Sequence, residues 1–298
     1  MTSERKTHLD TLAVISLIAC SFLWGLNQVA AKVALAEIPP LLQATVRSFG
    51  GVALVLLWAR LRGIALFQRD GTLPGGLLAG ALFAAEFACI FIGLQFTTAS
   101  RMIVFIYIAP FIVALGMPFI AHGERLSPVQ AGGLVLAFAG VASAFAEGFT
   151  QPATGPKQWM GDALGVVAAA LWAATTLSIR ATRLNTASAE KTLAYQLGVS
   201  GVLLGLGALW QGESWPQHAS ALALGSLAFQ TIVVVFASYL LWFWLVRHYP
   251  ATRLAAFTLL TPVFGLLMGV LMLSDPLTSR LLLALAGVAL GMVLVNRR

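Results

Sequence analysis

The chain has 298 residues, of which 59% are hydrophobic and 10% charged, and its mean hydropathy is +0.89. Soluble domains average about 45–50% apolar and about 25% charged residues, so this composition excludes a soluble enzyme or binding module and predicts an integral membrane protein. The net charge of +7 does not indicate nucleic-acid binding, because the basic residues lie between apolar runs and form no patch.

Apolar runs of about 20 residues recur along the whole chain, each long enough to cross a hydrocarbon core of about 30 Å as a helix. Short clusters of Pro, Gly, Arg, Glu or Thr separate them, and no soluble domain is expected between them. The predicted fold class is therefore all-α integral membrane with ten transmembrane helices, at residues 11–35, 40–60, 74–96, 99–121, 127–147, 160–183, 189–210, 219–246, 251–273 and 277–296.

The charges between these runs predict the orientation of the chain. If the N-terminus is cytoplasmic, most Lys and Arg residues fall on the cytoplasmic side, as the positive-inside rule requires. Arg47 lies within a span, and four residues face outward: Lys32, Arg101, Lys157 and Arg280. Both termini are therefore expected in the cytoplasm.

The chain contains an internal repeat. Residues 98–110, TASRMIVFIYIAP, align without a gap with residues 250–262, PATRLAAFTLLTP, and LWGLNQVAAK at 23–32 aligns with LWAATTLSIR at 171–180. We expect two five-helix repeats, residues 1–150 and 151–298. Because five is odd, the second repeat must be inverted, which places Arg101 outside and Arg253 inside. Inverted repeats are typical of secondary transporters that bind substrate near the middle of the membrane.

Several motifs carry a resemblance to a known family. They are Trp24-Gly25-x-Asn27, Arg47, Pro110 and Gly123-Glu124-Arg125-Leu126 with Gln130 and Gly133 in the first repeat, and Trp172-Ala173, Pro262 and Leu277-Thr278 in the second. On these residues the chain resembles the drug/metabolite transporter superfamily, specifically the ten-helix EamA-type exporters, and among them the bacterial YddG-like aromatic and amino-acid exporters. It departs from the family pattern at Asp275-Pro276, where a Gly-Glu pair is expected. The resemblance implies a carrier in the bacterial inner membrane.

Polar residues follow a tryptophan in the first span. Trp24, Asn27 and Gln28 project from one helix face, with Lys32 at its edge. Polar side chains in a bilayer almost always face the bundle interior or a wet cavity. The aligned residues Trp172, Thr175 and Thr176 repeat the pattern, so we expect both stripes to line a substrate cavity. Hydrogen bonds between helices, worth about 0.6–2 kcal/mol each, are the alternative.

Proline occupies the same position in spans four and nine. Pro110 and Pro262 interrupt the helical hydrogen bonds there, and paired interruptions in the two halves point to a binding site. Tyr107 flanks the first proline, and Thr258 and Thr261 flank the second. Prolines are also common in transmembrane helices, which is the structural alternative.

Three ionisable residues are candidates for gating or coupling. Glu86 is the only acidic residue near the middle of a span, and it is expected to carry a coupling proton, to bind a substrate ammonium, or to pair with Asn27, Gln28 or Lys32. Arg47 lies about two turns into span two, where it either gates the route, anchors a loop or snorkels to the surface. Lys32 completes this group, and Tyr239 is a further lining candidate.

These residues predict a cavity for a small amphipathic substrate, with aromatic contacts at one end and hydrogen bonds at the other. The resemblance implies amino-acid export, with aromatic amino acids among the candidates. Nucleosides, nucleotide-sugars, cationic compounds and a channel remain alternatives. No HExxH, GxSG or pair of mid-membrane aspartates indicates an enzyme, and we expect no cofactor and no metal. The expected partners are a small-molecule substrate and membrane lipid, with the protein acting as a monomer.

Overall fold

The computed structural model describes residues 10–120, 127–249, 254, 257–258 and 260–295. These residues form helices and short connections, without any β-strand. Eight helical segments are long and apolar enough to cross a membrane, and two shorter apolar helices accompany them within the same described part. The predicted all-α integral membrane class is confirmed.

The observed spans follow the predicted ones closely. In the first half of the chain they are α1 (Thr11–Ala34), α2 (Pro40–Leu61), α3 (Leu73–Gly93), α4 (Ala99–Ile106) with α5 (Ala109–Ile120), and α6 (Pro128–Thr150). In the second half they are α7 (Gln158–Ala181), a short 3₁₀ turn η1 (Arg183–Thr186), α8 (Ala189–Trp210), α9 (Ala221–Ala228) with η2 (Phe229–Ser238) and α10 (Tyr239–His248), α12 (Leu260–Leu273) and α13 (Ser279–Val295).

Short polar residues begin many of these helices. Asp10 accepts a hydrogen bond from the Ala13 amide at the start of α1, and Ser127 forms a reciprocal capping box with Gln130 at the start of α6. Such caps satisfy amides that have no partner within the helix. This local chemistry explains why the boundaries could be predicted to within a few residues.

Span four is interrupted next to Pro110, as predicted. Helix α4 ends at Ile106 and α5 begins at Ala109, so the proline occupies the second position of the new helix. A missing N–H costs little at that position, whereas inside a continuous helix it would remove a hydrogen bond. Tyr107 lies at the junction. The matching interruption before Pro262 falls partly on residues 255–256 and 259, which lie outside the described residues.

Span eight contains a π-helix that the sequence did not predict. It runs from Phe229 to Ser238 between α9 and α10. Wider helical turns of this kind are uncommon and occur frequently at functional sites. Here the π-helix ends immediately before Tyr239, a residue of the candidate site.

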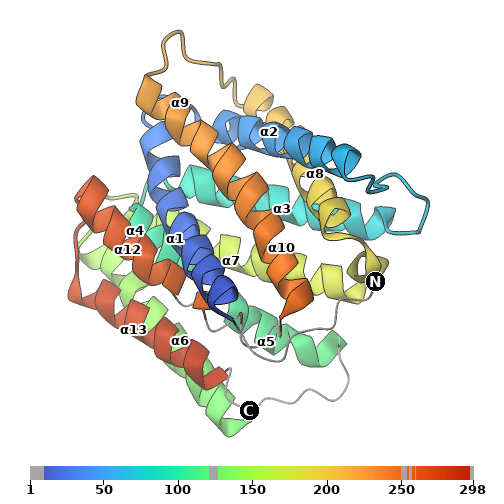
Figure 1. Cartoon of the computed structure of the whole chain (residues 1–298). Helices are drawn as coiled ribbons and strands as arrows, with labels where there is room; N and C mark the ends of the chain where they lie inside the picture. Colours follow the sequence, from blue (N-terminus) through green and yellow to red (C-terminus); the bar gives the residue numbers. More distant parts are fainter. Residues whose placement is uncertain (1–9, 121–126, 250–253, 255–256, 259, 296–298) are drawn as a thin grey trace.

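The helices pair across the two halves of the chain. Helix α6 packs beside α13, α2 beside α8, α1 against α12, and α7 against α4 and α5, while α3 contacts both α7 and α8. Figure 1 shows the α6–α13 pair at one side and the α9–α10 span crossing the bundle. The α1–α12 and α7–α5 pairings correspond under exchange of the two halves.

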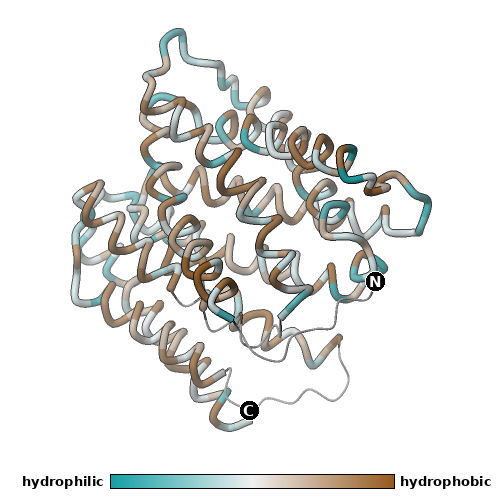
Figure 2. Tube along the Cα trace, viewed as in Figure 1, coloured by the Kyte–Doolittle hydropathy of each residue, from teal (hydrophilic) through white to brown (hydrophobic). Residues whose placement is uncertain are grey.

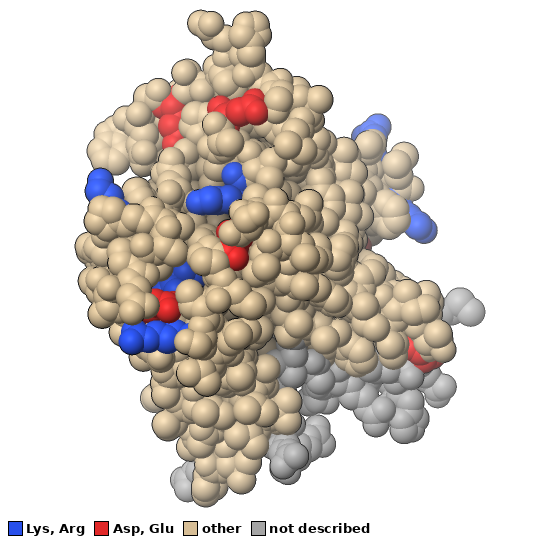
Figure 3. Space-filling model, turned by 90° about the vertical axis from the view of Figure 1, so that its left-hand side faces the viewer, with Lys and Arg blue, Asp and Glu red and all other residues tan. Residues whose placement is uncertain are grey.

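The exterior of the bundle is apolar. Figure 2 shows hydrophobic residues along the helices and hydrophilic residues concentrated in the connections. The face in Figure 3 is mostly uncharged, and its charged side chains lie in a few separate groups. Large apolar side chains such as Leu209, Trp210 and Phe119 are exposed. An outer surface of this kind suits contact with lipid, because its side chains are apolar and its helices satisfy their own backbone hydrogen bonds.

Candidate substrate site between the helices

Tyr239 lies at the centre of a cluster of aromatic and polar side chains. Its ring centroid is 6.4 Å from that of Trp24 on α1. Its hydroxyl lies next to the guanidinium of Arg47 on α2 and within electrostatic range of Glu86 on α3 and Tyr107 at the α4–α5 junction. Helices from both halves of the chain therefore contribute to one site.

Arg47 is buried in this site. Only 1% of its surface is exposed, and its guanidinium carbon lies 4.0 Å from the ring centroid of Phe87 and 5.8 Å from that of Phe91. A cation over an aromatic face is stabilised by the ring quadrupole. The Nε and Nη2 atoms have no hydrogen-bond partner. The snorkelling alternative is therefore wrong, because the side chain points into the bundle and not to its surface.

Glu86 faces Arg47 from the neighbouring helix α3. The residue is 5% exposed, and its Oε2 atom has no hydrogen-bond partner. Ion pairs within the described part of the chain join Arg101 to Glu147 and Asp162, and Lys191 to Asp70, but none joins Arg47 to Glu86. Arg47 and Glu86 are therefore neighbours that form no ion pair with each other.

The stripe on α1 lies inside the bundle, with Asn27 and Gln28 buried and Trp24 half-buried. Trp24 donates its indole N–H to the Ser238 hydroxyl at 2.9 Å and packs edge-on to Trp242 at 5.3 Å. Asn27 and Gln28 are buried one turn further along, and their side-chain carbonyl oxygens have no partner. Buried polar atoms are normally paired, so these two amides are candidates for contact with a ligand or water.

The equivalent stripe on α7 behaves differently. Trp172 packs edge-on to Tyr107 with ring centroids 5.6 Å apart, which places it at the site. Thr175 and Thr176 instead donate their hydroxyls to the carbonyls of Leu171 and Trp172 one turn back, at 2.9 and 3.1 Å. The repeated sequence therefore does not produce equally available polar groups in the two halves.

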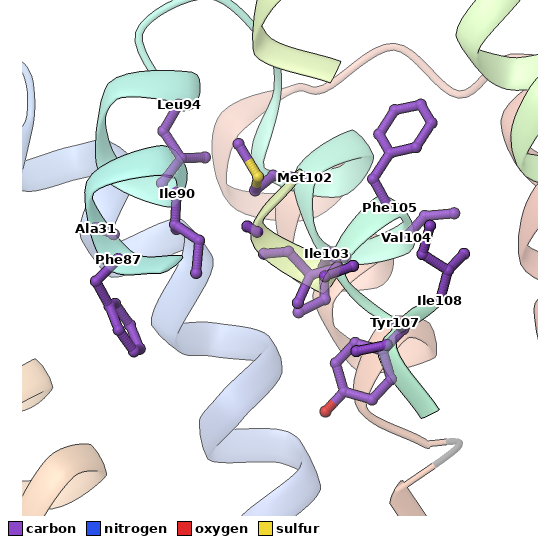
Figure 4. Close-up of a cluster of buried hydrophobic side chains, with 14 of the residues drawn as sticks. Ala31, Phe87, Ile90, Leu94, Met102, Ile103, Val104, Phe105, Tyr107 and Ile108 are labelled. Carbon is purple, nitrogen blue, oxygen red and sulfur yellow. The ribbon is translucent and has the colours of Figure 1, made fainter. Parts of the chain in front are cut away.

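Tyr107 projects from the α4–α5 junction, with its hydroxyl directed toward α1 (Figure 4). It lies close to Thr261 on α12, and both residues are buried. Pro262 is buried beside Thr261, whereas Pro110 and Thr258 are half-buried. The predicted residues around both prolines are thus brought to the same region of the bundle.

Lys32 lies away from Glu86. Its ammonium group donates to the Leu94 carbonyl at the C-terminal end of α3 and, at 2.8 Å, to the Thr97 carbonyl in the connection between α3 and α4. A cation is favourable there because the last carbonyls of a helix carry partial negative charge. The geometry gives Lys32 a helix-capping contact and does not bring it to the coupling candidates.

The sequence did not predict a buried ion network around Arg101, which was expected to face outward near the start of span four. Arg101 is 3% exposed and bonds Glu147 at 2.8 Å and Asp162 at 2.7 Å, which ties α4 to α6 and α7. Thr97 and Thr278 donate to these carboxylates at 2.6 and 2.8 Å. The available signal was that both acids flank the short connection between spans five and six, on the side predicted for Arg101. Its repeat counterpart, Arg253, lies outside the described residues.

Among the described residues, eight long and two shorter apolar helical segments surround the candidate site, which defines a multi-pass membrane protein. The profile of the EamA-like transporter family matches residues 11–146 and 159–297, once in each half of the chain. The chain belongs to this family, and it is a membrane transporter, which confirms the predicted relation to the drug/metabolite transporter superfamily.

Relatives extend along nearly the whole chain. It is 29% identical over 97% of its length to the uncharacterized transporter YvbV of Bacillus subtilis, covering 92% of that protein. It is 30% identical over its full length to the uncharacterized transporter sll0355 of Synechocystis sp., covering 94% of that protein. A solved crystal structure with 19% identity superposes with a TM-score of 0.67 over 95% of both chains, a similarity of fold alone.

Proposed function

We propose that this transporter exports amino acids, aromatic ones included, and related small metabolites across the bacterial inner membrane by alternating access. The observation that carries the proposal is a buried set of polar groups with unsatisfied atoms, on Asn27, Gln28, Arg47 and Glu86. Polar groups without partners are costly in a membrane interior unless a ligand or water completes them.

Aromatic side chains surround these polar groups. Trp24 and Tyr239 contact each other on one side, and Tyr107 and Trp172 contact each other on the other. A wall of this kind suits a molecule with one apolar end and one polar end. An amino acid with an aromatic or aliphatic side chain fits that description.

Alternating access follows from the repeat. We take residues 1–150 and 151–298 as two inverted copies whose conformations exchange, so that the site opens to either side in turn. The corresponding α1–α12 and α7–α5 pairings support this assignment. The loop charges support cytoplasmic termini, and the site is built within one chain, which supports a monomer as the working unit.

Other substrates fit this site less well. A nucleotide-sugar would require several converging cations for its phosphates. Arg47 is the cation that the described residues place in the site, because Lys32 is bound to backbone carbonyls. A nucleoside or a neutral drug remains compatible with the aromatic wall and is the second candidate. A channel is disfavoured because the inverted repeat favours a carrier.

The test is counterflow in proteoliposomes that contain the purified full chain. Saturable exchange of a labelled amino acid such as phenylalanine is expected, and nucleosides tested in parallel should exchange weakly. Trp24→Ala and Trp172→Ala should each reduce exchange several-fold by removing the aromatic wall. Trp210→Ala is the matched control, because Trp210 is 87% exposed on the outer surface. Absence of saturable amino-acid exchange by the folded protein would refute the proposal.

A further inference from the structure

We propose that Arg47 and Glu86 together bind the two charges of one zwitterionic substrate, with Arg47 holding the carboxylate and Glu86 holding the ammonium group. This inference rests on the proposed amino-acid transport and specifies its recognition chemistry. Arg47 and Glu86, which were separate candidates for gating or coupling, then form one binding site.

Neither Arg47 nor Glu86 has a full set of hydrogen-bond partners. Arg47 and Glu86 lie on the adjacent helices α2 and α3, more than nine-tenths buried and within electrostatic range of each other. They form no ion pair, and Arg47 Nε, Arg47 Nη2 and Glu86 Oε2 have no hydrogen-bond partner. Burying a charge is unfavourable unless it is paired and hydrogen-bonded. A molecule that carries both charges would complete the two residues at once.

The two unpaired nitrogen atoms of Arg47 suit a carboxylate. Nε and Nη2 lie on the same edge of a guanidinium group, and two parallel N–H groups on one edge match the two oxygens of a carboxylate. Phe87 covers the face of the guanidinium at 4.0 Å. The arginine is therefore held by its face, while an edge suited to a carboxylate remains unpaired.

The surroundings of Arg47 and Glu86, which together we call the clamp, restrict the substrate side chain. Tyr239 borders the clamp, contacts Trp24 and lies within electrostatic range of Tyr107. Within the described part of the site, no further charged side chain accompanies Arg47 and Glu86. A third charge on the substrate would therefore have no partner there. The clamp should favour α-amino acids with neutral, apolar side chains over acidic or basic ones.

The experiment compares three competitors that share one side chain: phenylalanine, phenethylamine, which lacks the carboxylate, and 3-phenylpropionate, which lacks the ammonium group. Each is titrated against counterflow of labelled phenylalanine in proteoliposomes. For the unaltered protein, phenylalanine should inhibit at least tenfold more strongly than either analogue. Equal inhibition by all three would overturn the clamp without any variant.

Two charge-removing variants test the assignment of each charge. Arg47→Gln should shift the preference at least tenfold toward phenethylamine, because Glu86 remains for the ammonium group. Glu86→Gln should shift it by a similar factor toward 3-phenylpropionate. Trp210→Ala should leave the order unchanged. If phenylalanine exchanges but both variants keep the original order, the clamp is wrong and amino-acid transport stands. If the unaltered protein exchanges no amino acid, the proposed function fails first.

Discussion

Replacement of Arg101 by methionine should destabilise the protein strongly. Arg101 donates to both carboxylate oxygens of Asp162, to Glu147 and to the Ala144 carbonyl. Asp162 and Glu147 are 0% and 4% exposed, so bulk water cannot hydrate their carboxylates once the cation is lost. Breaking a buried ion pair by removing one partner typically costs about 3–5 kcal/mol.

That cost corresponds to at least about a 100-fold decrease in the folding equilibrium constant, since each 1.4 kcal/mol is a factor of ten. Reversible unfolding in mixed detergent micelles measures it. The triple variant Arg101→Met, Glu147→Gln, Asp162→Asn should recover most of the loss, because neutral side chains of similar shape no longer need the cation. Recovery would separate the charge effect from lost packing.

Arg280→Met is the matched control. Its guanidinium donates to the exposed Thr150 hydroxyl at 3.4 Å, a long hydrogen bond on the surface, so its loss should be nearly neutral. The reasoning is refuted if Arg101→Met costs less than about 1 kcal/mol, which is the range of solvent-exposed pairs. Such a result would mean that water reaches the two carboxylates.

Two further predictions concern packing and pH. Gly25→Ala should lower the midpoint of thermal unfolding. The added Cβ would lie 2.6 Å from the Gly265 amide nitrogen and force α1 away from α12. Overpacking of this kind typically costs about 1–3 kcal/mol. Gly225→Ala, with open space around its Cβ, should leave the midpoint unchanged or raise it, and equal effects of both variants would contradict the close approach. Hydrogen bonds from Lys191 and Thr72 hold the pKa of Asp70, in the connection between α2 and α3, below its ordinary value. This stabilisation is complete above the ordinary aspartate pKa and is lost as the pH falls toward the lowered pKa. When the unfolding midpoint is measured as the pH is lowered, Asp70→Asn should therefore show a smaller decline than the unaltered protein. An identical decline in both proteins would contradict the role of Asp70.

The spans could be predicted because their signals are local. Runs of apolar residues bounded by caps such as Asp10 and Ser127 act within a few residues of the chain, and the break before Pro110 follows from one missing N–H. The π-helix at Phe229–Ser238 was not predicted, because its sequence contains no proline or glycine that would mark a departure from the α-helix.

The candidate site was predicted in part. The α1 stripe was assigned to the interior from its polarity and Tyr107 from its place beside Pro110, and the structure buries Asn27, Gln28 and Tyr107 together with Arg47. The proximity of Arg47 to Glu86 and Tyr239 was not predictable, since these residues come from three different helices and Tyr239 is far from the other two in the sequence. The internal repeat also overstated the equivalence of the halves, because Thr175 and Thr176 bond to their own helix.

By itself, the sequence determined that this protein is a ten-span membrane transporter assembled from repeated segments, since apolar length and repeated motifs are properties of neighbouring residues. Only the tertiary structure decided which buried charges have partners. Arg101 found two carboxylates across helix interfaces, whereas Arg47 and Glu86 face each other with atoms left unpaired. The physical reason is that hydrogen bonding and charge pairing depend on distances of a few ångströms between helices, and those distances are set by packing rather than by the order of residues along any one helix.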